Sequence, residues 1–274
     1  MNINKDDFDY IRDLVRRSSA IALEEGKEYL VEARLMPVAN EEGIGSIEDL
    51  VAKLRVHPQN ELHNKVVEAM TTNETSWFRD IQPFETLKNF VLPELLKKRE
   101  AERSLNIWCA ACSSGQEPYS IAMLFREHFP ELARWRVRFV ASDISSEMLA
   151  RAREGCYSQI EVNRGLPAPL LVKYFQKNGL KWQIKGDIIK MVEFQQINLA
   201  TSWPVLPTMD VVFMRNVLIY FDMETKKAIL GKVRQVLKYD GYLFLGGAET
   251  TLNIDCSFEK VRMENVTCYV LRGA

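Results

Sequence analysis

The sequence has no long apolar run and no excess of basic residues, and each absence excludes a class of protein. No stretch approaches the roughly 20 apolar residues needed to cross a bilayer, and the N-terminal residues lack the basic and apolar regions of a secretory signal. The 36 Lys and Arg residues are balanced by 37 Asp and Glu residues, whereas nonspecific nucleic-acid binding needs a basic surface. We therefore expect a cytoplasmic protein without membrane insertion or nucleic-acid binding.

Cysteine is also scarce. The cysteines are Cys109, Cys112, Cys156, Cys256 and Cys268. Their odd number and wide spacing do not fit a disulfide framework. Cys109 and Cys112 form a Cys-x-x-Cys pair, but Cys109 lies within an apolar run and not at the exposed start of a helix. Because no second pair or histidine accompanies them at zinc spacing, we expect no metal and interpret both as packing or pocket residues. A dithiol oxidoreductase is the weaker alternative.

The chain does contain two regions with different hydrophobic periodicity. Up to about residue 72 the apolar residues recur at helical spacing, as in Phe8 to Val15 and Tyr29 to Leu35. Ser46, followed three residues later by Asp49, resembles a helix N-terminal capping arrangement. We predict an all-helical N-terminal domain over residues 1–72, followed by a connecting segment and helix over residues 73–100.

From residue 101 to residue 274 short apolar runs alternate with helical segments. The runs cover residues 105–111, 137–141, 211–214 and 242–245. Continuous apolar runs are typical of parallel strands that are buried on both faces, and the helices between them imply right-handed crossovers. The pattern predicts a doubly wound α/β domain.

Two further β features are predicted within this domain. Residues 155–191 are broken by Pro167 and Gly179, and two short strands are predicted around residues 185–187. We interpret the region as an inserted antiparallel β-subdomain, with an irregular crossover loop as the alternative. Near the C-terminus, two β-forming runs flank Glu264 and Asn265, which predicts an antiparallel hairpin at the sheet edge. Rossmann folds of the methyltransferase type end in this way.

The first core strand leads directly into a turn of small residues, residues 110–115. Ligands of open α/β sheets bind beyond the carboxyl ends of the strands, but only Gly115 is a glycine, so a dinucleotide pyrophosphate has no obvious cradle. A ligand without phosphates, such as S-adenosylmethionine, fits better. Asp143 ends the second strand, where a carboxylate accepts ribose hydroxyls or alternatively caps the next helix. Glu117 either faces a cationic group of the ligand or complements the helix dipole.

Four segments, in this order, resemble the CheR chemoreceptor glutamate methyltransferases. They are TTNETSWFRD (71–80), AACSSGQEPYSIAM (110–123), ASDIS (141–145) and RNVLIYFD (215–222). The similarity covers nearly the whole chain. It implies a Rossmann-like S-adenosylmethionine-dependent methyltransferase fold with a helical N-terminal domain and an inserted β-subdomain. It also implies the activity, which is methyl transfer to glutamate carboxylates of chemoreceptor cytoplasmic domains in chemotactic adaptation, with S-adenosylhomocysteine as the product.

The same resemblance implies a set of site residues. The cofactor pocket would contain Asn73, Thr75, Arg79, Glu117, Asp143, Asn198, Leu199, Arg215 and Asn216. Arg79 would orient the substrate carboxylate and Tyr220 would donate a hydrogen bond near the reaction centre. Local alternatives remain. Residues 71–73 would only end a helix, Asn198 would only make a turn, and Asn216 would only end a strand. Arg79 would form a surface ion pair. Tyr220 would be a packed aromatic side chain.

The implied partner is the helical bundle of a methyl-accepting chemoreceptor. Arg12 and Arg16 lie four residues apart, so they would present cations to an acidic helix, although a solvated helix face is the simpler interpretation. In some relatives the β-subdomain binds a receptor C-terminal peptide by strand addition. Nothing in the sequence requires more than a monomer. The alternatives are a methyltransferase for another substrate and a cofactor-binding sensor without catalysis.

Overall fold

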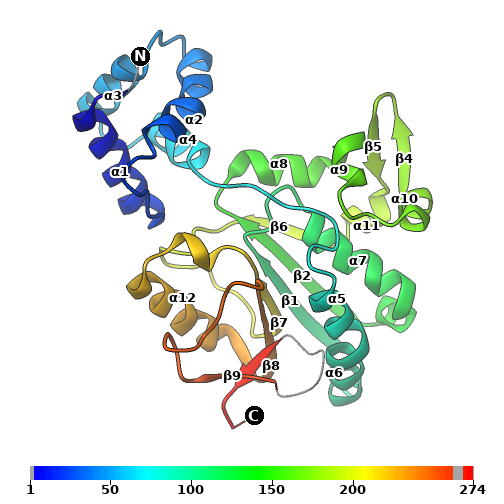
Figure 1. Cartoon of the computed structure of the whole chain (residues 1–274). Coiled ribbons are helices and arrows are strands. Elements are labelled where there is room, and N and C mark those ends of the chain that lie inside the picture. Colours follow the sequence, from blue (N-terminus) through cyan, green and yellow to red (C-terminus); the bar gives the residue numbers. More distant parts are fainter. Residues whose placement is uncertain (1–2, 262–267, 274) are drawn as a thin grey trace. The chain divides into compact units, whose positions relative to one another are not determined.

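The computed structural model describes residues 3–261 and 268–273. By its internal contacts the chain divides into two compact units, coloured along the sequence in Figure 1. The smaller unit comprises residues 1–72, 198–202 and 220–226, and the larger unit comprises residues 73–197, 203–219 and 227–274. Among the described residues, no helix is both long and apolar enough to cross a bilayer.

The smaller unit is built from helices, as its periodicity predicts. They are α1 (Lys5–Ser19), α2 (Glu28–Glu41), α3 (Ile47–Val56) and α4 (Glu61–Ala69). The hydroxyl of Ser46 accepts a hydrogen bond from the Asp49 N–H at 3.0 Å, so the predicted cap of α3 is confirmed. Leu35 is fully buried, but Tyr29, the first residue of the predicted second stripe, is 65% exposed. That stripe therefore begins later than predicted.

The larger unit is built around a seven-stranded sheet of order β6-β2-β1-β7-β8-β10-β9 (Figure 1). The strands are β1 (Ser104–Ala110), β2 (Arg136–Asp143), β6 (Glu193–Gln196), β7 (Met209–Met214), β8 (Leu237–Leu245), β9 (Phe258–Lys260) and β10 (Tyr269–Leu271). The first five pair in parallel. Every residue of β7 is buried, because a central parallel strand is covered on both faces. The predicted doubly wound α/β fold is confirmed.

Helices alternate with these strands along the chain. They are α5 (Gln82–Thr86), a π-helical turn (Leu87–Val91), α6 (Leu92–Lys98), α7 (Gln116–His128), a 3-10 helix (Pro130–Arg134), α8 (Ser146–Glu154), a 3-10 helix (Leu218–Tyr220) and α12 (Met223–Val236). Side chains of neighbouring strands fill the core between them. The rings of Phe213 and Phe244 stack with their centroids 4.3 Å apart, so packing of the sheet positions the ends of β7 and β8.

The β-subdomain is present, but one of its predicted strands is wrong. Its strands β3 (Cys156–Ser158), β4 (Phe175–Asn178) and β5 (Lys181–Ile184) form an antiparallel sheet of order β3-β5-β4. Helices α9 (Gln159–Asn163), α10 (Ala168–Tyr174) and α11 (Gly186–Ile189) accompany it. The hairpin turns at Gly179, which has a left-handed φ of 59°. The predicted turn at residues 185–187 and the strand predicted after it are wrong, because residues 186–189 form the helical turn α11. One helical turn lets both Ile188 and Ile189 reach the core, whereas a strand would point them to opposite faces.

The two strands of the predicted C-terminal hairpin are present. β9 and β10 pair antiparallel, with Tyr269 opposite Lys260, and β10 also pairs antiparallel with β8. The proposed turn residues Glu264 and Asn265 lie outside the described residues. The parallel part of the sheet thus ends at β8, and an antiparallel pair completes that edge.

Candidate active site

The turn that follows β1 is tightly wound. Ala111, Ser113 and Gly115 all have left-handed φ angles, of 57°, 49° and 95°. A Cβ on Gly115 would lie 3.0 Å from the Cβ of Ala152 and 3.1 Å from the ring of Tyr119, so a larger residue would meet both strain and crowding. The small residues therefore bring the backbone of this turn close to the start of α7.

Asp143, at the end of β2, ties this turn to the next one. Its carboxylate accepts hydrogen bonds from the N–H of Ser113 at 2.7 Å and from the N–H of Ser145 at 2.9 Å. The cap of α8 is the hydroxyl of Ser145, which accepts from the Met148 N–H. Ser145 is thus the N-cap residue of α8, and Asp143 supports the start of the helix by accepting the N–H of Ser145. The Asp143 carboxylate therefore links the turns after β1 and β2, at the carboxyl end of the strands, where ligands of open α/β sheets bind.

Arg215 follows β7 and is the most buried charge at this end of the sheet, with a side chain 1% exposed. Its guanidinium donates to the carboxylates of Glu117 and Asp80, at 2.8 Å each, and to the carbonyl of Arg79 at 2.9 Å. Burial raises the pKa of Glu117, and the charge of Arg215 opposes that rise. Asp80 was not predicted, although it ends the first segment that carries the family resemblance.

Residues 73–80, the first part of the connecting segment, are held against the rest of the larger unit by hydrogen bonds of their backbone. The carbonyl of Asn73 accepts from the hydroxyl of Ser113 at 2.9 Å, and the N–H of Phe78 donates to the hydroxyl of Ser120 at 3.1 Å. Phe78 has a left-handed φ of 46°. These bonds hold the segment beside the turn after β1.

Arg79 is half-buried on this segment, as is Thr75. One of its guanidinium nitrogens donates to the carbonyl of Glu74 at 3.0 Å. Within the described residues it forms no ion pair, since no carboxylate oxygen lies within 4.0 Å. The alternative of a surface ion pair is therefore not supported there, although the charge of Arg79 acts at longer range on Glu117, where it opposes the rise in pKa that burial causes.

Asn216 continues the chain beyond Arg215 in a left-handed conformation, with a φ of 57°. Its N–H donates to the carboxylate of Glu249 at 2.8 Å. It does more than end a strand, because a side chain from the loop after β8 holds its backbone. Sequence reasoning missed Glu249, and the only local signal was an acidic residue soon after a buried strand.

Three predicted site residues belong to the smaller unit. Asn198 accepts from the Ala200 N–H at 3.0 Å and donates to the Ser18 carbonyl at 2.6 Å, so it does form the turn of its alternative interpretation. Leu199 is 6% exposed, and the carbonyl of Tyr220 accepts from the Ala22 N–H at 3.1 Å. The other predicted residues lie together in the larger unit. They are Asn73, Thr75, Arg79, Glu117, Asp143, Arg215 and Asn216.

Cys109 and Cys112 are both buried, and burial raises the pKa of each thiol well above its ordinary value of 9.0. Since the thiolate is the reactive form, this environment suppresses dithiol chemistry and supports the packing interpretation. Among the described residues, no group of three His, Cys, Asp or Glu side chains is arranged to hold a metal ion.

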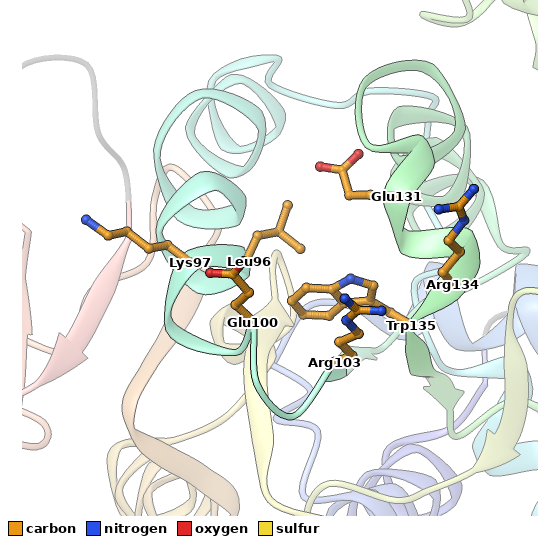
Figure 2. Close-up of a pocket in the computed structure, with 7 residues that line it drawn as sticks. All are labelled: Leu96, Lys97, Glu100, Arg103, Glu131, Arg134 and Trp135. Atoms are coloured by element: carbon orange, nitrogen blue, oxygen red, sulfur yellow. The ribbon is translucent and has the colours of Figure 1, made fainter.

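A separate hollow of about 400 Å³ lies at the opposite end of the strands (Figure 2). It opens between α6 and the 3-10 helix over residues 130–134. Arg103 and Trp135 line it and directly precede β1 and β2. Because cofactors of open α/β sheets bind at the carboxyl ends of the strands, this hollow is not the predicted cofactor site. Its lining residues are Leu96, Lys97, Glu100, Arg103, Glu131, Arg134 and Trp135.

The residues at the carboxyl ends fit S-adenosylmethionine. Glu117 and Asp143 supply carboxylates for a cationic ligand that also carries ribose hydroxyls. The Nε of Arg215 is buried and has no hydrogen-bond partner among the described residues, and an unpaired buried donor indicates a missing acceptor such as a ligand carboxylate. The single glycine of the turn offers no phosphate cradle. The side chains and the turn together therefore suit this cofactor better than a dinucleotide.

Comparison with protein families matches both parts of the chain. The model described as CheR methyltransferase, SAM binding domain, matches residues 73–267, and that described as CheR methyltransferase, all-alpha domain, matches residues 6–71. The predicted family resemblance, fold class and cofactor are confirmed.

Individual relatives cover nearly the same length. Chemotaxis protein methyltransferase Cher2 of Pseudomonas putida is 41% identical over 261 residues, 93% of this chain and 94% of that protein. Chemotaxis protein methyltransferase 1 of Pseudomonas aeruginosa is 43% identical over 260 residues, with the same two coverages of 93% and 94%. The solved glycopeptide N-methyltransferase MtfA with S-adenosylmethionine is 15% identical and covers 64% of this chain and 58% of its own, with a TM-score of 0.35. That remote likeness adds nothing to the assignment. The chain belongs to the CheR methyltransferase family and is an S-adenosylmethionine-dependent methyltransferase.

Proposed function

We propose that this enzyme methylates glutamate side chains on the cytoplasmic helical bundle of chemoreceptors, and so serves adaptation in bacterial chemotaxis. The observation that carries the proposal is the extent of the family match, which includes the all-helical domain as well as the cofactor domain. Binding of S-adenosylmethionine does not by itself explain a shared helical domain. A shared protein substrate does, and the relatives are named chemotaxis protein methyltransferases.

The chemistry of this reaction asks little of the enzyme beyond alignment. S-adenosylmethionine supplies an electrophilic methyl carbon on a sulfonium, and a glutamate with an unperturbed pKa of about 4.3 is already ionised at neutral pH. No general base is required. Holding two reactants in line is worth effective molarities of about 10⁵ to 10⁸ M in model systems. Because opposite charges are neutralised during the reaction, strong stabilisation of both ions beforehand would oppose it.

The roles of the site residues follow from this requirement. Arg79, whose guanidinium donates to the Glu74 carbonyl and forms no ion pair among the described residues, orients the substrate glutamate. Tyr220 donates a hydrogen bond near the reacting atoms. Asp143 holds the ribose hydroxyls, while Glu117 and Arg215 hold the charged amino-acid end of the cofactor. The pocket is completed by Asn73, Thr75, Asn198, Leu199 and Asn216.

Further assignments belong to the same proposal. The enzyme works as a monomer in the cytoplasm, and its domains divide at residues 1–72, 73–100 and 101–274, with the insert at about 155–191. Arg12 and Arg16 dock to the receptor, which requires them to leave their present ion pairs with Asp9 at 2.9 Å and Asp222 at 3.4 Å.

The β-subdomain is proposed to bind a receptor C-terminal peptide. Its edge strands are β3 and β4, which pair on one side only within the three-stranded sheet. Leu180, next to the hairpin turn, is 92% exposed, and Val172 on α10 is 78% exposed. An unpaired edge beside exposed apolar side chains suits strand addition.

The decisive experiment uses methyl-labelled S-adenosylmethionine and a purified chemoreceptor cytoplasmic fragment. Label incorporated as a glutamate methyl ester is released as methanol by mild base, whereas label on nitrogen is not. We expect base-labile label on receptor glutamates. Label that resists base, or transfer only to other proteins, would contradict the proposed substrate. Binding of the cofactor without any transfer would favour the sensor.

Arg79→Ala tests the proposed catalytic role. Loss of the orienting cation is expected to lower methylation by about 10²-fold or more while thermal unfolding is unchanged. Arg12→Glu with Arg16→Glu tests docking in the same assay, with the expectation that KM for the receptor rises. Near-normal turnover by folded Arg79→Ala would remove this arginine from the mechanism.

A further inference from the structure

Glu249 lies in the loop after β8, is 9% exposed, and binds an unusual number of backbone donors. Its Oε2 accepts from the N–H of Asn216 at 2.8 Å and from that of Gly246 at 2.7 Å. Its Oε1 accepts from the N–H of Val217 at 2.9 Å and from that of Ile219 at 3.3 Å. One carboxylate thus binds four backbone N–H groups, three of them from the segment after β7.

That segment carries residues of the proposed site. Arg215 stands at its beginning, Asn216 follows, and Ile219 directly precedes Tyr220 in the chain. Asn216 has a left-handed φ of 57°, a conformation that a non-glycine residue keeps only when its surroundings hold it. The bonds to Glu249 supply that support from a different loop, because no side chain within the segment accepts from these N–H groups in the described structure.

The glycine beside Glu249 is shaped to allow this contact. A Cβ on Gly246 would lie 2.7 Å from the side-chain nitrogen of Asn216, 2.8 Å from its backbone nitrogen and 2.8 Å from Oε2 of Glu249. No atom lies within 4 Å of a Cβ placed on the next residue, Gly247. The close approach of the two loops therefore requires glycine at one position and not at its neighbour.

We propose that Glu249 is a positioning residue that holds the segment from residue 216 to residue 219 in the conformation that binds the cofactor. It acts through the backbone of Asn216 and its neighbours, without touching the reacting atoms. This inference rests on the proposed function only where receptor methylation is measured. Binding of S-adenosylhomocysteine can be measured without a receptor.

The experiment measures binding of S-adenosylhomocysteine by calorimetry to the full chain. Glu249→Gln keeps the shape of the side chain, but its amide nitrogen faces N–H groups and cannot accept their hydrogen bonds. We expect at least about tenfold weaker binding for this variant, an intermediate effect for Glu249→Asp, and weakened binding for Gly246→Ala. Gly247→Ala is the matched control and should bind as the unmodified chain does.

Asp210→Asn is the control for loss of stability, because Asp210 lies at the other end of β7 and also accepts a backbone N–H. It should lower the unfolding temperature at least as much as Glu249→Gln and leave S-adenosylhomocysteine binding unchanged. The inference would be overturned if folded Glu249→Gln and Gly246→Ala bound S-adenosylhomocysteine as the unmodified chain does. It would also be overturned if Asp210→Asn lost as much affinity for S-adenosylhomocysteine as Glu249→Gln. The variants could change S-adenosylhomocysteine binding as expected while the unmodified chain fails to methylate the receptor. That result would contradict the proposed function and not the role of Glu249.

Discussion

Arg99 and Arg215 are both buried arginines held between two carboxylates, but they lie at opposite ends of the central sheet. At the amino end, Arg99 donates to Asp210 at 2.9 Å and to Asp240 at 2.5 Å. Lys238 also pairs with Asp210, at 2.9 Å. At the carboxyl end, Arg215 binds Glu117 and Asp80, yet its Nε has no partner among the described residues.

Left-handed conformations occur at both ends, at Ala111, Ser113 and Asn216 at the carboxyl end and at Arg103 at the amino end. The pKa shifts separate the two ends more clearly. At the amino end the hydrogen bond from Arg99 lowers the pKa of Asp240, which favours the charged carboxylate, whereas at the carboxyl end burial raises the pKa of Glu117, which disfavours it. An unpaired buried donor and a carboxyl group whose charged form is disfavoured are typical of functional sites, because the surrounding fold must hold such groups ready for a ligand. The amino end has paired charges that serve stability. The difference separates a structural arginine from the arginine that we propose to bind the cofactor.

The largest effect is expected from Asp210→Asn. Asp210 is fully buried, and removing its charge leaves Arg99 and Lys238 without their shared partner, which should lower the free energy of unfolding by about 3–5 kcal/mol. Urea denaturation measures this change. If the folded variant also bound S-adenosylhomocysteine more weakly, the amino end would not serve stability alone.

Arg215→Met should affect binding as well as stability. The variant leaves Glu117 buried without its cation and removes the unpaired donor that we assign to the cofactor. We expect S-adenosylhomocysteine to bind about 10- to 100-fold more weakly, or about 1.4–2.8 kcal/mol, by calorimetry. A variant that lost only stability would make Arg215 a second structural arginine.

A smaller effect concerns the pH dependence of stability. Because the pKa of Glu117 is raised above its ordinary value of 4.5, the folded chain keeps this proton at pH values where the unfolded chain has released it. The contribution to stability is fully present below pH 4.5 and is lost as the pH rises through the folded pKa. Glu117→Gln cannot ionise, so its free energy of unfolding relative to the unmodified chain should rise across that window. Urea denaturation from pH 4 to pH 7 tests this, and a pH-independent difference would contradict it.

The smallest effect is expected from Lys98→Ala at the amino end. Lys98 pairs with Glu94 at 2.6 Å, but its side chain is 38% exposed. Solvent and salt screen such pairs, so the free energy of unfolding should change by about 0–1 kcal/mol. A loss as large as that of Asp210→Asn would show that the surface charges belong to the buried network.

Much of the fold could be predicted because its signals are local. The runs that became β1, β2, β7 and β8 are continuous, which is the pattern of strands covered on both faces. The cap at Ser46 depends on an atom three residues away. A second short strand was predicted after a turn at residues 185–187, yet residues 186–189 form α11. Periodicity does not distinguish a strand from a single helical turn in so short an apolar run.

The site was predictable in part. Glu117 and Asp143 follow strands in sequence, so their place at the carboxyl ends could be expected. Asp80 lies 135 residues from its partner Arg215, and Glu249 lies 33 residues from Asn216. Neither pairing leaves a pattern along the chain. Asn198, Leu199 and Tyr220 were predicted for the same pocket, and they group with the helices of the smaller unit.

The sequence by itself determined the core strands, the helical N-terminal region, the family and the cofactor class, because hydrophobic periodicity, caps and the motifs after strands are properties of neighbouring residues. Only the tertiary structure decided which buried charges are paired and which backbone is held by a distant side chain. Those outcomes depend on where separate loops meet after the sheet has packed. For Arg99 and Arg215, the same residue type therefore has one environment that suits stability and another that suits a ligand.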